Sequence, residues 1–169
     1  MFTIRHCAAL LTALAIAFRT VTLAQEPKSA QLPVDQARLF EATCKTLAET
    51  FMKNDVDSFL KLCLPKDLLA EVLAPKVLER GTEALHKQML EANAKRFAEF
   101  RKRFQDLEGF QFVSAEVGYR LERADTYSDP KLILKNSYFT IGYANRIILK
   151  IKIEDMVFIG GKYYIIQLD

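Results

Sequence analysis

The hydrophobic period of the sequence changes at Gly109, and this change limits the folds that the chain can adopt. Before this glycine, apolar residues recur at intervals of three and four, which is the spacing of one helix face. After it, apolar and polar residues alternate, as in a strand with one buried face. Helices first and strands last are typical of an α+β fold, in which helices cover one face of an antiparallel sheet.

The segment from residue 146 to residue 154 is the clearest strand of the sequence. Its aliphatic positions, which alternate with charged ones, are Ile147, Leu149, Ile151 and Ile153, and the charged ones are Arg146, Lys150, Lys152 and Glu154. The aliphatic face has to be covered, and only the preceding helices are available to cover it. The opposite face is mostly basic, so it is expected to be partly wet or to meet a partner. We predict a curved, cone-like, four-stranded antiparallel sheet with the N-terminal helices packed on one face.

The other elements follow from residue spacing and from chain breakers. Helices are predicted at residues 33–53, 56–63, 67–73 and 83–107. Further strands are predicted at residues 113–121, 132–141 and 162–168, the last after a hairpin turn at Gly160–Gly161. In the first of these strands, Val113 and every second residue up to Leu121 are expected to face the core. Glu154 and Asp155 predict a β-bulge, because the strand pattern continues on both sides of them.

The first 24 residues have the pattern of a signal peptide. A short basic region precedes an apolar run of about 12 residues, and small side chains stand at Thr22 and Ala24. Cleavage after Ala24 leaves a polar tether at residues 25–32 and a single domain at residues 33–169, exported to the periplasm or the extracellular space. The apolar run is shorter than the roughly 20 residues of a membrane-spanning helix, so no span is expected after cleavage. An uncleaved membrane anchor is the alternative.

The charge of the mature chain argues against one class of partner. Removal of Arg5 and Arg19 with the leader leaves 22 basic and 21 acidic side chains. A nearly neutral domain has no general attraction for phosphates, so no nucleic-acid partner is expected. Acidic residues interleave with the cations near the end of the predicted 83–107 helix, which favours a solvated helix face there. These cations are Lys95, Arg96, Arg101, Lys102 and Arg103.

Two segments resemble the nuclear-transport-factor-2-like superfamily, also called the cystatin-like or cone-shaped α+β fold. The first is Phe51–Pro65, in which a small acidic turn precedes an apolar helix, and the second is the Ile147–Leu168 hairpin with its glycine turn. Residues 66–80 depart from the family pattern, since they look helical where many members have a short strand. The resemblance implies a domain that often dimerises through the open face of its sheet. It selects no activity, because the fold hosts isomerases, cyclases, dehydratases, hydrolases and non-catalytic binding domains.

A pocket is expected where the concave face of the sheet meets the helices. The resemblance implies that an acid and a tyrosine would act there as base and oxyanion donor, which selects Tyr119 with Asp55 or Asp57. The two acids can equally cap the second helix, and this structural role is the preferred interpretation. Phe40 and Phe59 are candidates for the pocket wall, although their spacing fits the core first.

Cys44 and Cys63 are the only cysteines beyond the leader. They lie ten residues before and nine residues after Asn54, so an antiparallel helix pair would bring them to the same level. An exported protein meets an oxidising compartment, which permits a disulfide between them. The alternative is two buried free thiols that pack as small hydrophobes.

No metal site and no cofactor are predicted. His86 is the only histidine beyond the leader, and no cysteine pair at ligand spacing accompanies it. We interpret His86 as a partly exposed surface residue. The sequence contains no phosphate loop, nucleophile elbow or repeat, so nothing in it calls for a bound cofactor.

Two classes of function stay open on this basis. The first is an exported, non-catalytic binding or interaction domain of unknown ligand, homodimeric through its sheet, for which a small hydrophobic molecule is one candidate ligand. The second is a small-molecule enzyme of the isomerase or cyclase kind, with a hydrophobic substrate inside the cone. Phenylalanine side chains that filled the cone would leave no space for such a substrate, so the packing inside the cone separates the two classes.

Overall fold

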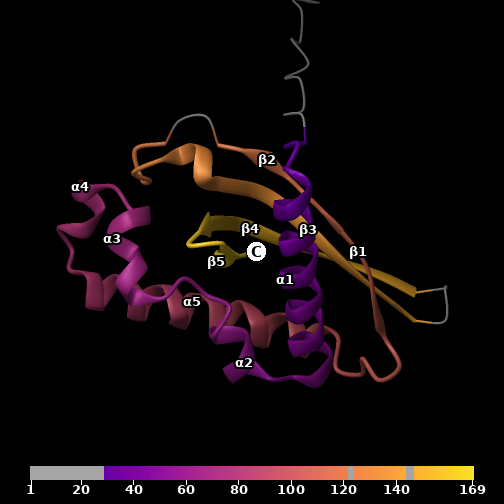
Figure 1. Ribbon diagram of the computed structural model, residues 1–169. Coiled ribbons are helices and arrows are strands. Elements are labelled where there is room, and N and C mark those ends of the chain that lie inside the picture. Colours follow the sequence, from indigo (N-terminus) through magenta and orange to yellow (C-terminus); the bar gives the residue numbers. More distant parts are fainter. Residues whose placement is uncertain (1–28, 122–123, 144–146) are drawn as a thin grey trace, which may run out of the picture.

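The computed structural model describes residues 29–121, 124–143 and 147–169, except for the side chain of residue 147. The predicted leader, residues 1–24, lies outside these ranges, as do residues 25–28 of the predicted tether. The chain forms an α+β domain, in which helices lie on one side of an antiparallel sheet (Figure 1). This arrangement confirms the fold class predicted from the change of period at Gly109.

The helical layer occupies residues 34–103. Its long helices are α1 (Val34–Lys53) and α5 (Thr82–Arg103), and short helical turns connect them: α2 (Val56–Leu60), η1 (Lys66–Leu68), α3 (Leu69–Val72) and α4 (Pro75–Leu78). Helix α1 ends at Asn54, which adopts the left-handed conformation with φ of 54°. An asparagine tolerates this conformation better than most residues, so it can close the helix and reverse the chain.

The sheet occupies the C-terminal part of the chain. Its strands are β1 (Gln111–Glu116), β2 (Tyr119–Arg120), β3 (Ile133–Tyr143), β4 (Ile147–Ile159) and β5 (Lys162–Leu168), with a 3-10 turn, η2 (Pro130–Leu132), before β3. The main path runs in the order β1-β3-β4-β5 with antiparallel pairing throughout, and the short β2 also pairs with β3. Gly160 and Gly161 close the β4–β5 hairpin with φ of 57° and 76°, values that glycine adopts without strain.

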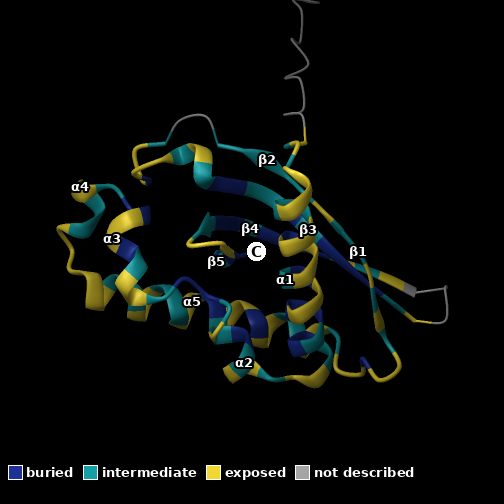
Figure 2. Ribbon diagram, viewed as in Figure 1, coloured by how far each residue is buried: buried dark blue, intermediate teal, exposed yellow. Residues whose placement is uncertain are grey.

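The aliphatic face of β4 lies against the helical layer. Ile151 and Ile153 are buried, with exposed fractions of 3% and 0%, whereas Ile148 on the other face is 65% exposed. Helix α1 packs across β1, β3 and β5, and α5 packs on β5. Figure 2 shows the buried residues along the surfaces where helices and sheet meet. The sequence-based prediction that helices cover this strand face is therefore confirmed.

The inside of the cone is filled by phenylalanine rings. Phe51 of α1 lies at their centre, with its ring centroid 4.4 Å from that of Phe97, 4.9 Å from Phe100, 5.7 Å from Phe139 and 6.0 Å from Phe59. These rings come from α2, α5 and β3, so one side chain joins three elements to α1. Such tilted and edge-on pairs add to the free energy that burial alone supplies.

A second apolar cluster closes the other end of the domain. It joins α3 to β3 and β4, and its buried members are Leu64, Leu69, Val72, Leu73, Tyr127, Ile133 and Val157. The hydroxyl of Tyr127 donates a hydrogen bond of 2.7 Å to Oδ2 of Asp155, the residue at the β4 bulge. The Nζ atom of Lys135 lies 2.7 Å from Oδ1 of the same carboxylate, so the buried charge of Asp155 is paired. The bulge predicted at Glu154–Asp155 is thus confirmed.

Two predicted helices are shorter in the structure. The second one ends at Leu60 rather than at Cys63, because the backbone of residues 62–64 bonds to Ile165 of β5 instead. The fourth one ends at Arg103 rather than at residue 107, and Leu107 is buried in the connection that follows. Both predicted helices were too long, because apolar residues that follow each helix happen to continue its spacing.

The first predicted strand, residues 113–121, is wrong in two respects. A register shift between Phe112 and Ser114 turns Val113 outward, where it is 56% exposed instead of facing the core. The strand is also interrupted before β2 at Gly118, where a Cβ atom would lie 1.7 Å from the carbonyl oxygen of Lys135. Only glycine permits this approach. Alternation in the sequence shows neither the bulge nor the interruption.

Residues 29–32 of the predicted tether lie beside the sheet. The backbone N–H of Ala30 donates to the carbonyl of Gly118 at 2.7 Å, and Ser29 Oγ donates to the carbonyl of Val117 at 2.8 Å. Ala30 and Leu32 also pack against the main core. Among the described residues, none of the helices is both long enough and apolar enough to cross a membrane.

Replacement of Phe51 by alanine is expected to lower the free energy of unfolding by about 3–5 kcal/mol, because the surrounding rings cannot all collapse into the cavity. The matched control is Phe104→Ala, since the Phe104 ring is only partly buried and packs on Phe100. It is expected to cost about 1–2 kcal/mol. Urea unfolding followed by circular dichroism measures both values, and equal losses would contradict the central place of Phe51.

Candidate functional site

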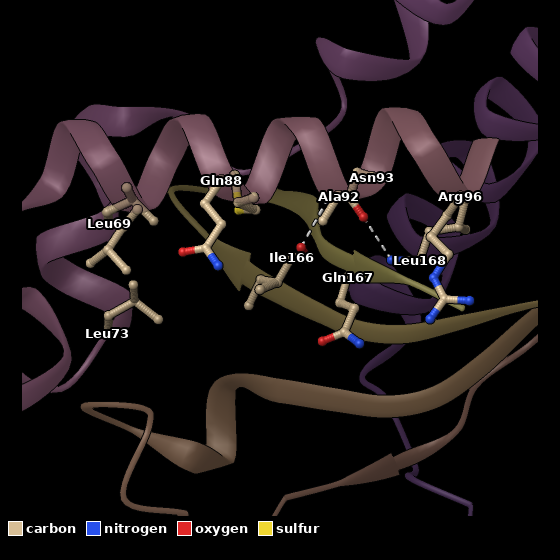
Figure 3. A pocket seen from close by; sticks show the side chains of 11 residues that line it. Leu69, Leu73, Gln88, Ala92, Asn93, Arg96, Ile166, Gln167 and Leu168 are labelled. Carbon is tan, nitrogen blue, oxygen red and sulfur yellow. Dashed lines mark hydrogen bonds between the residues drawn. The ribbon is translucent and has the colours of Figure 1, made fainter. Parts of the chain in front are cut away.

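An apolar cleft lies between α3, α5 and β5. Its volume is about 350 Å³, which is within the range of sites for small molecules. Figure 3 shows Leu69 and Leu73 at one end of the cleft and Arg96 at the other, with Ile166 between them. The residues that line it are Leu69, Leu73, Leu85, Gln88, Met89, Ala92, Asn93, Arg96, Ile166, Gln167 and Leu168.

Helix α5 supplies one wall of this cleft through a single face. Leu85, Met89, Ala92 and Arg96 follow one another at intervals of four, three and four, so their side chains leave the helix in nearly the same direction. Most of the charged residues of α5 are exposed and do not line the cleft, among them Lys95 and Lys102. The helix therefore has a solvated side, a side that lines the cleft and a buried side that packs into the core.

Asn93 fixes the distance between α5 and β5. Its Nδ2 atom donates to the carbonyl oxygen of Ile166 at 3.0 Å, and its Oδ1 atom accepts from the N–H of Leu168 at 2.9 Å (Figure 3). The same Nδ2 lies 3.6 Å from Sγ of Cys63. The side chain is 2% exposed, so these bonds replace the water that would otherwise solvate an amide. The wall of the cleft is thereby held to the sheet by a polar contact.

The free edge of β5 is covered by two separate groups. The backbone N–H of Leu64 donates to the carbonyl of Ile165 at 2.9 Å, and the N–H of Ile165 donates to the carbonyl of Leu62 at 2.9 Å. Further along the strand, the side-chain amide of Asn93 covers the edge in place of residues 62–64. An uncovered edge can pair with another chain, and this one is covered between Ile165 and Leu168. The part of the edge that Asn93 covers also borders the cleft, because Asn93, Ile166 and Leu168 are among its lining residues.

The polar groups of the cleft are amides and one guanidinium. Gln88 and Gln167 stand at its rim, and Arg96 extends from α5 towards β5 at one end (Figure 3). Among the described residues that line the cleft there is no carboxylate, imidazole, thiol or hydroxyl. The lining offers hydrogen bonds, one positive charge and an apolar floor, which are groups that bind and orient a molecule.

The predicted trio of Tyr119, Asp55 and Asp57 is not brought together. Tyr119 lies in β2 at one end of the domain, and both acids lie at α2 at the other end (Figure 1). Oδ1 of Asp55 accepts a hydrogen bond of 2.9 Å from the N–H of Ser58, which caps α2 and lowers the pKa of this carboxyl. Asp57 is exposed in the first turn of the same helix. The capping interpretation is therefore confirmed for Asp55 alone.

The other residues that the sequence suggested for a site have structural roles or lie at the surface. Phe40 and Phe59 are buried in the main core, where Phe40 meets Tyr163 edge-on and Phe59 stacks on Phe97. His86 lies half-buried on α5. In the part of the chain that the structure describes, no three side chains of His, Cys, Asp or Glu gather as metal ligands would.

Both cysteines are free and buried in the structure. Cys44 lies within α1 in the main core, and Cys63 lies where the chain runs beside Ile165 of β5. Burial raises the pKa of each thiol from 9.0 to about 12. The reactive thiolate is therefore scarce at neutral pH in the folded protein.

The cleft was not predicted from the sequence, although one signal pointed to it. Leu85, Met89, Asn93 and Phe97 follow at intervals of four, so a polar residue stands in the middle of a helix stripe that is otherwise apolar. A buried amide in such a place requires partners from another element. This spacing predicts that Asn93 makes a contact with another element. It does not identify the two backbone groups to which Asn93 bonds.

The cysteines give a direct test of the buried-thiol state. Iodoacetamide at pH 8 is expected to leave both thiols unlabelled in the folded protein, because a pKa near 12 leaves about one thiolate in ten thousand. In denaturant without reductant, both thiols should be labelled at once, as mass spectrometry of the intact protein will show. Denatured protein that takes up no label would contradict this expectation and establish the Cys44–Cys63 disulfide.

Comparisons with known proteins found no matching family model, no matching curated protein and no matching solved structure.

Proposed function

We propose that this chain is a non-catalytic binding domain that holds a small apolar molecule in the cleft between α3, α5 and β5. The observation that carries the proposal is the composition of the cleft, in which an apolar floor is bordered by amides and one guanidinium. Ligand sites in proteins commonly combine an apolar surface with a few polar groups that orient the ligand. Leu69 and Leu73 would hold the apolar end, and Arg96 faces the other end.

Binding is favoured over catalysis by two features of the described residues. The cleft lining lacks groups that transfer protons near neutral pH or attack as nucleophiles. The cone, where an isomerase or cyclase of this fold would hold its substrate, is occupied by the rings around Phe51. The enzyme hypothesis is therefore the weaker of the two.

Membership of the nuclear-transport-factor-2-like superfamily is part of the same proposal. Its support is the order of elements, with helices before an antiparallel sheet, and the long β4–β5 hairpin with its glycine turn. Export is likewise proposed, from the apolar run and the small residues up to Ala24. An exported binding domain would meet its ligand in the periplasm or outside the cell.

Self-association through the open sheet face is a second proposal. The face of β4 that none of the described helices covers carries Ile148, which is 65% exposed, followed by Lys150 and Lys152. The lysines are already paired: Lys150 Nζ lies 2.6 Å from Glu116 Oε2, and Lys152 Nζ lies 2.8 Å from Asp169 Oδ2. Paired charges around an exposed isoleucine lower the cost of bringing two such faces together.

Filling the cleft is expected to abolish ligand binding. The neutral probe N-phenyl-1-naphthylamine should gain fluorescence with the wild-type protein and lose at least about tenfold in affinity with Ala92→Trp, because the indole would occupy the cleft. Ala98→Trp is the matched control, since Ala98 is exposed on the same helix outside the cleft lining. Equal probe binding by the wild-type protein and the Ala92→Trp variant would contradict the proposed site.

The dimer is tested by size-exclusion chromatography with light scattering at about 100 µM, roughly the range in which a weak homodimer forms. The wild-type protein is expected at twice the chain mass, and Ile148→Glu at the mass of one chain, because the new carboxylates would repel each other. Val34→Glu is the control, since Val34 is equally exposed but lies at the start of α1. A wild-type monomer at this concentration would refute the dimer.

A further inference from the structure

Arg96 is the one charged side chain among the described residues that line the cleft. Its guanidinium extends from α5 towards β5, beside Leu168 and Gln167 (Figure 3). Gln88 contributes a neutral amide from the same helix. A molecule in the cleft would thus meet an apolar floor along most of its length and a positive charge at one end.

The charges around Arg96 leave its hydrogen-bond donors available. The nearest carboxylate on its own helix belongs to Glu99, 4.0 Å away, which is at the limit of an ion pair and beyond a hydrogen bond. The carboxylate of Asp169 accepts a hydrogen bond of 2.8 Å from Lys152, which is the main reason that its pKa is lowered, and Arg96 adds only a smaller effect. Neither acid lines the cleft. The planar donors of arginine match a carboxylate in geometry as well as in charge.

We propose that the ligand of this cleft is an amphipathic monocarboxylate, whose carboxylate binds Arg96 while its hydrocarbon chain lies against α3 and Ile166. This inference rests on the proposed binding function and adds the chemical class of the ligand. The apolar residues at the far end, Leu69 and Leu73, place the end of the chain away from the charge. The amides of Gln88 and Gln167 would solvate the mouth of the cleft around the bound head group.

The experiment compares dodecanoate with dodecan-1-ol as competitors of N-phenyl-1-naphthylamine, both below the concentration at which they aggregate. The two molecules share a hydrocarbon chain and differ in the head group. With the wild-type protein, dodecanoate is expected to bind about five- to tenfold more tightly than the alcohol, as one partly exposed charged contact allows. Arg96→Gln is expected to remove this preference, and Arg96→Lys to keep part of it.

Arg103→Gln is the matched control, because it removes the same charge from the same helix outside the cleft. It is expected to leave the preference for the acid unchanged. Equal binding of acid and alcohol by the wild-type protein, or an unchanged preference in Arg96→Gln, would overturn the carboxylate inference and leave the cleft as an apolar site. Failure of both competitors to displace the probe would contradict the proposed binding function itself.

Discussion

Burial of the Phe51 ring of α1 among rings of α2, α5 and β3 joins the helical layer to the sheet. The rings of Phe59, Phe97, Phe100 and Phe139 approach it from α2, α5 and β3, so each element is held through the same side chain. Side chains packed at this density leave few voids that could admit a ligand. The same rings that stabilise the fold therefore leave little space for a small molecule inside the cone.

The cleft at that margin owes its shape to a polar contact. Asn93 bonds to two backbone groups of β5, which sets the separation of α5 and the strand while the apolar side chains on either side stay apart. The covered edge of β5 and the second apolar cluster around Leu69 and Leu73 fix the remaining walls. Binding in such a preformed site needs little ordering of the protein, which favours affinity.

The elements of this fold followed from hydrophobic period, but the site did not. Alternation at Ile151 and Ile153 predicted the buried face of β4 because a strand has only two faces and one had to be apolar. The same argument was wrong for Val113, since one extra residue at a bulge reverses the alternation without any mark in the sequence. Asn93 and the Tyr127–Asp155 pair depend on partners far along the chain, 73 and 28 residues away, which local patterns do not specify.

The proposed ligand site lies beside α5 and β5 and not inside the cone. Backbone amide chemical shifts of ¹⁵N-labelled protein, recorded while dodecanoate is added, test this claim residue by residue. The largest changes are expected at Leu85–Arg96 and at Ile166–Leu168, with little change at Phe51 and Phe139 in the filled interior. Changes that centre on Phe51, Phe139 and Ile153, with none along the α5 face, would place the ligand within the cone and contradict the account.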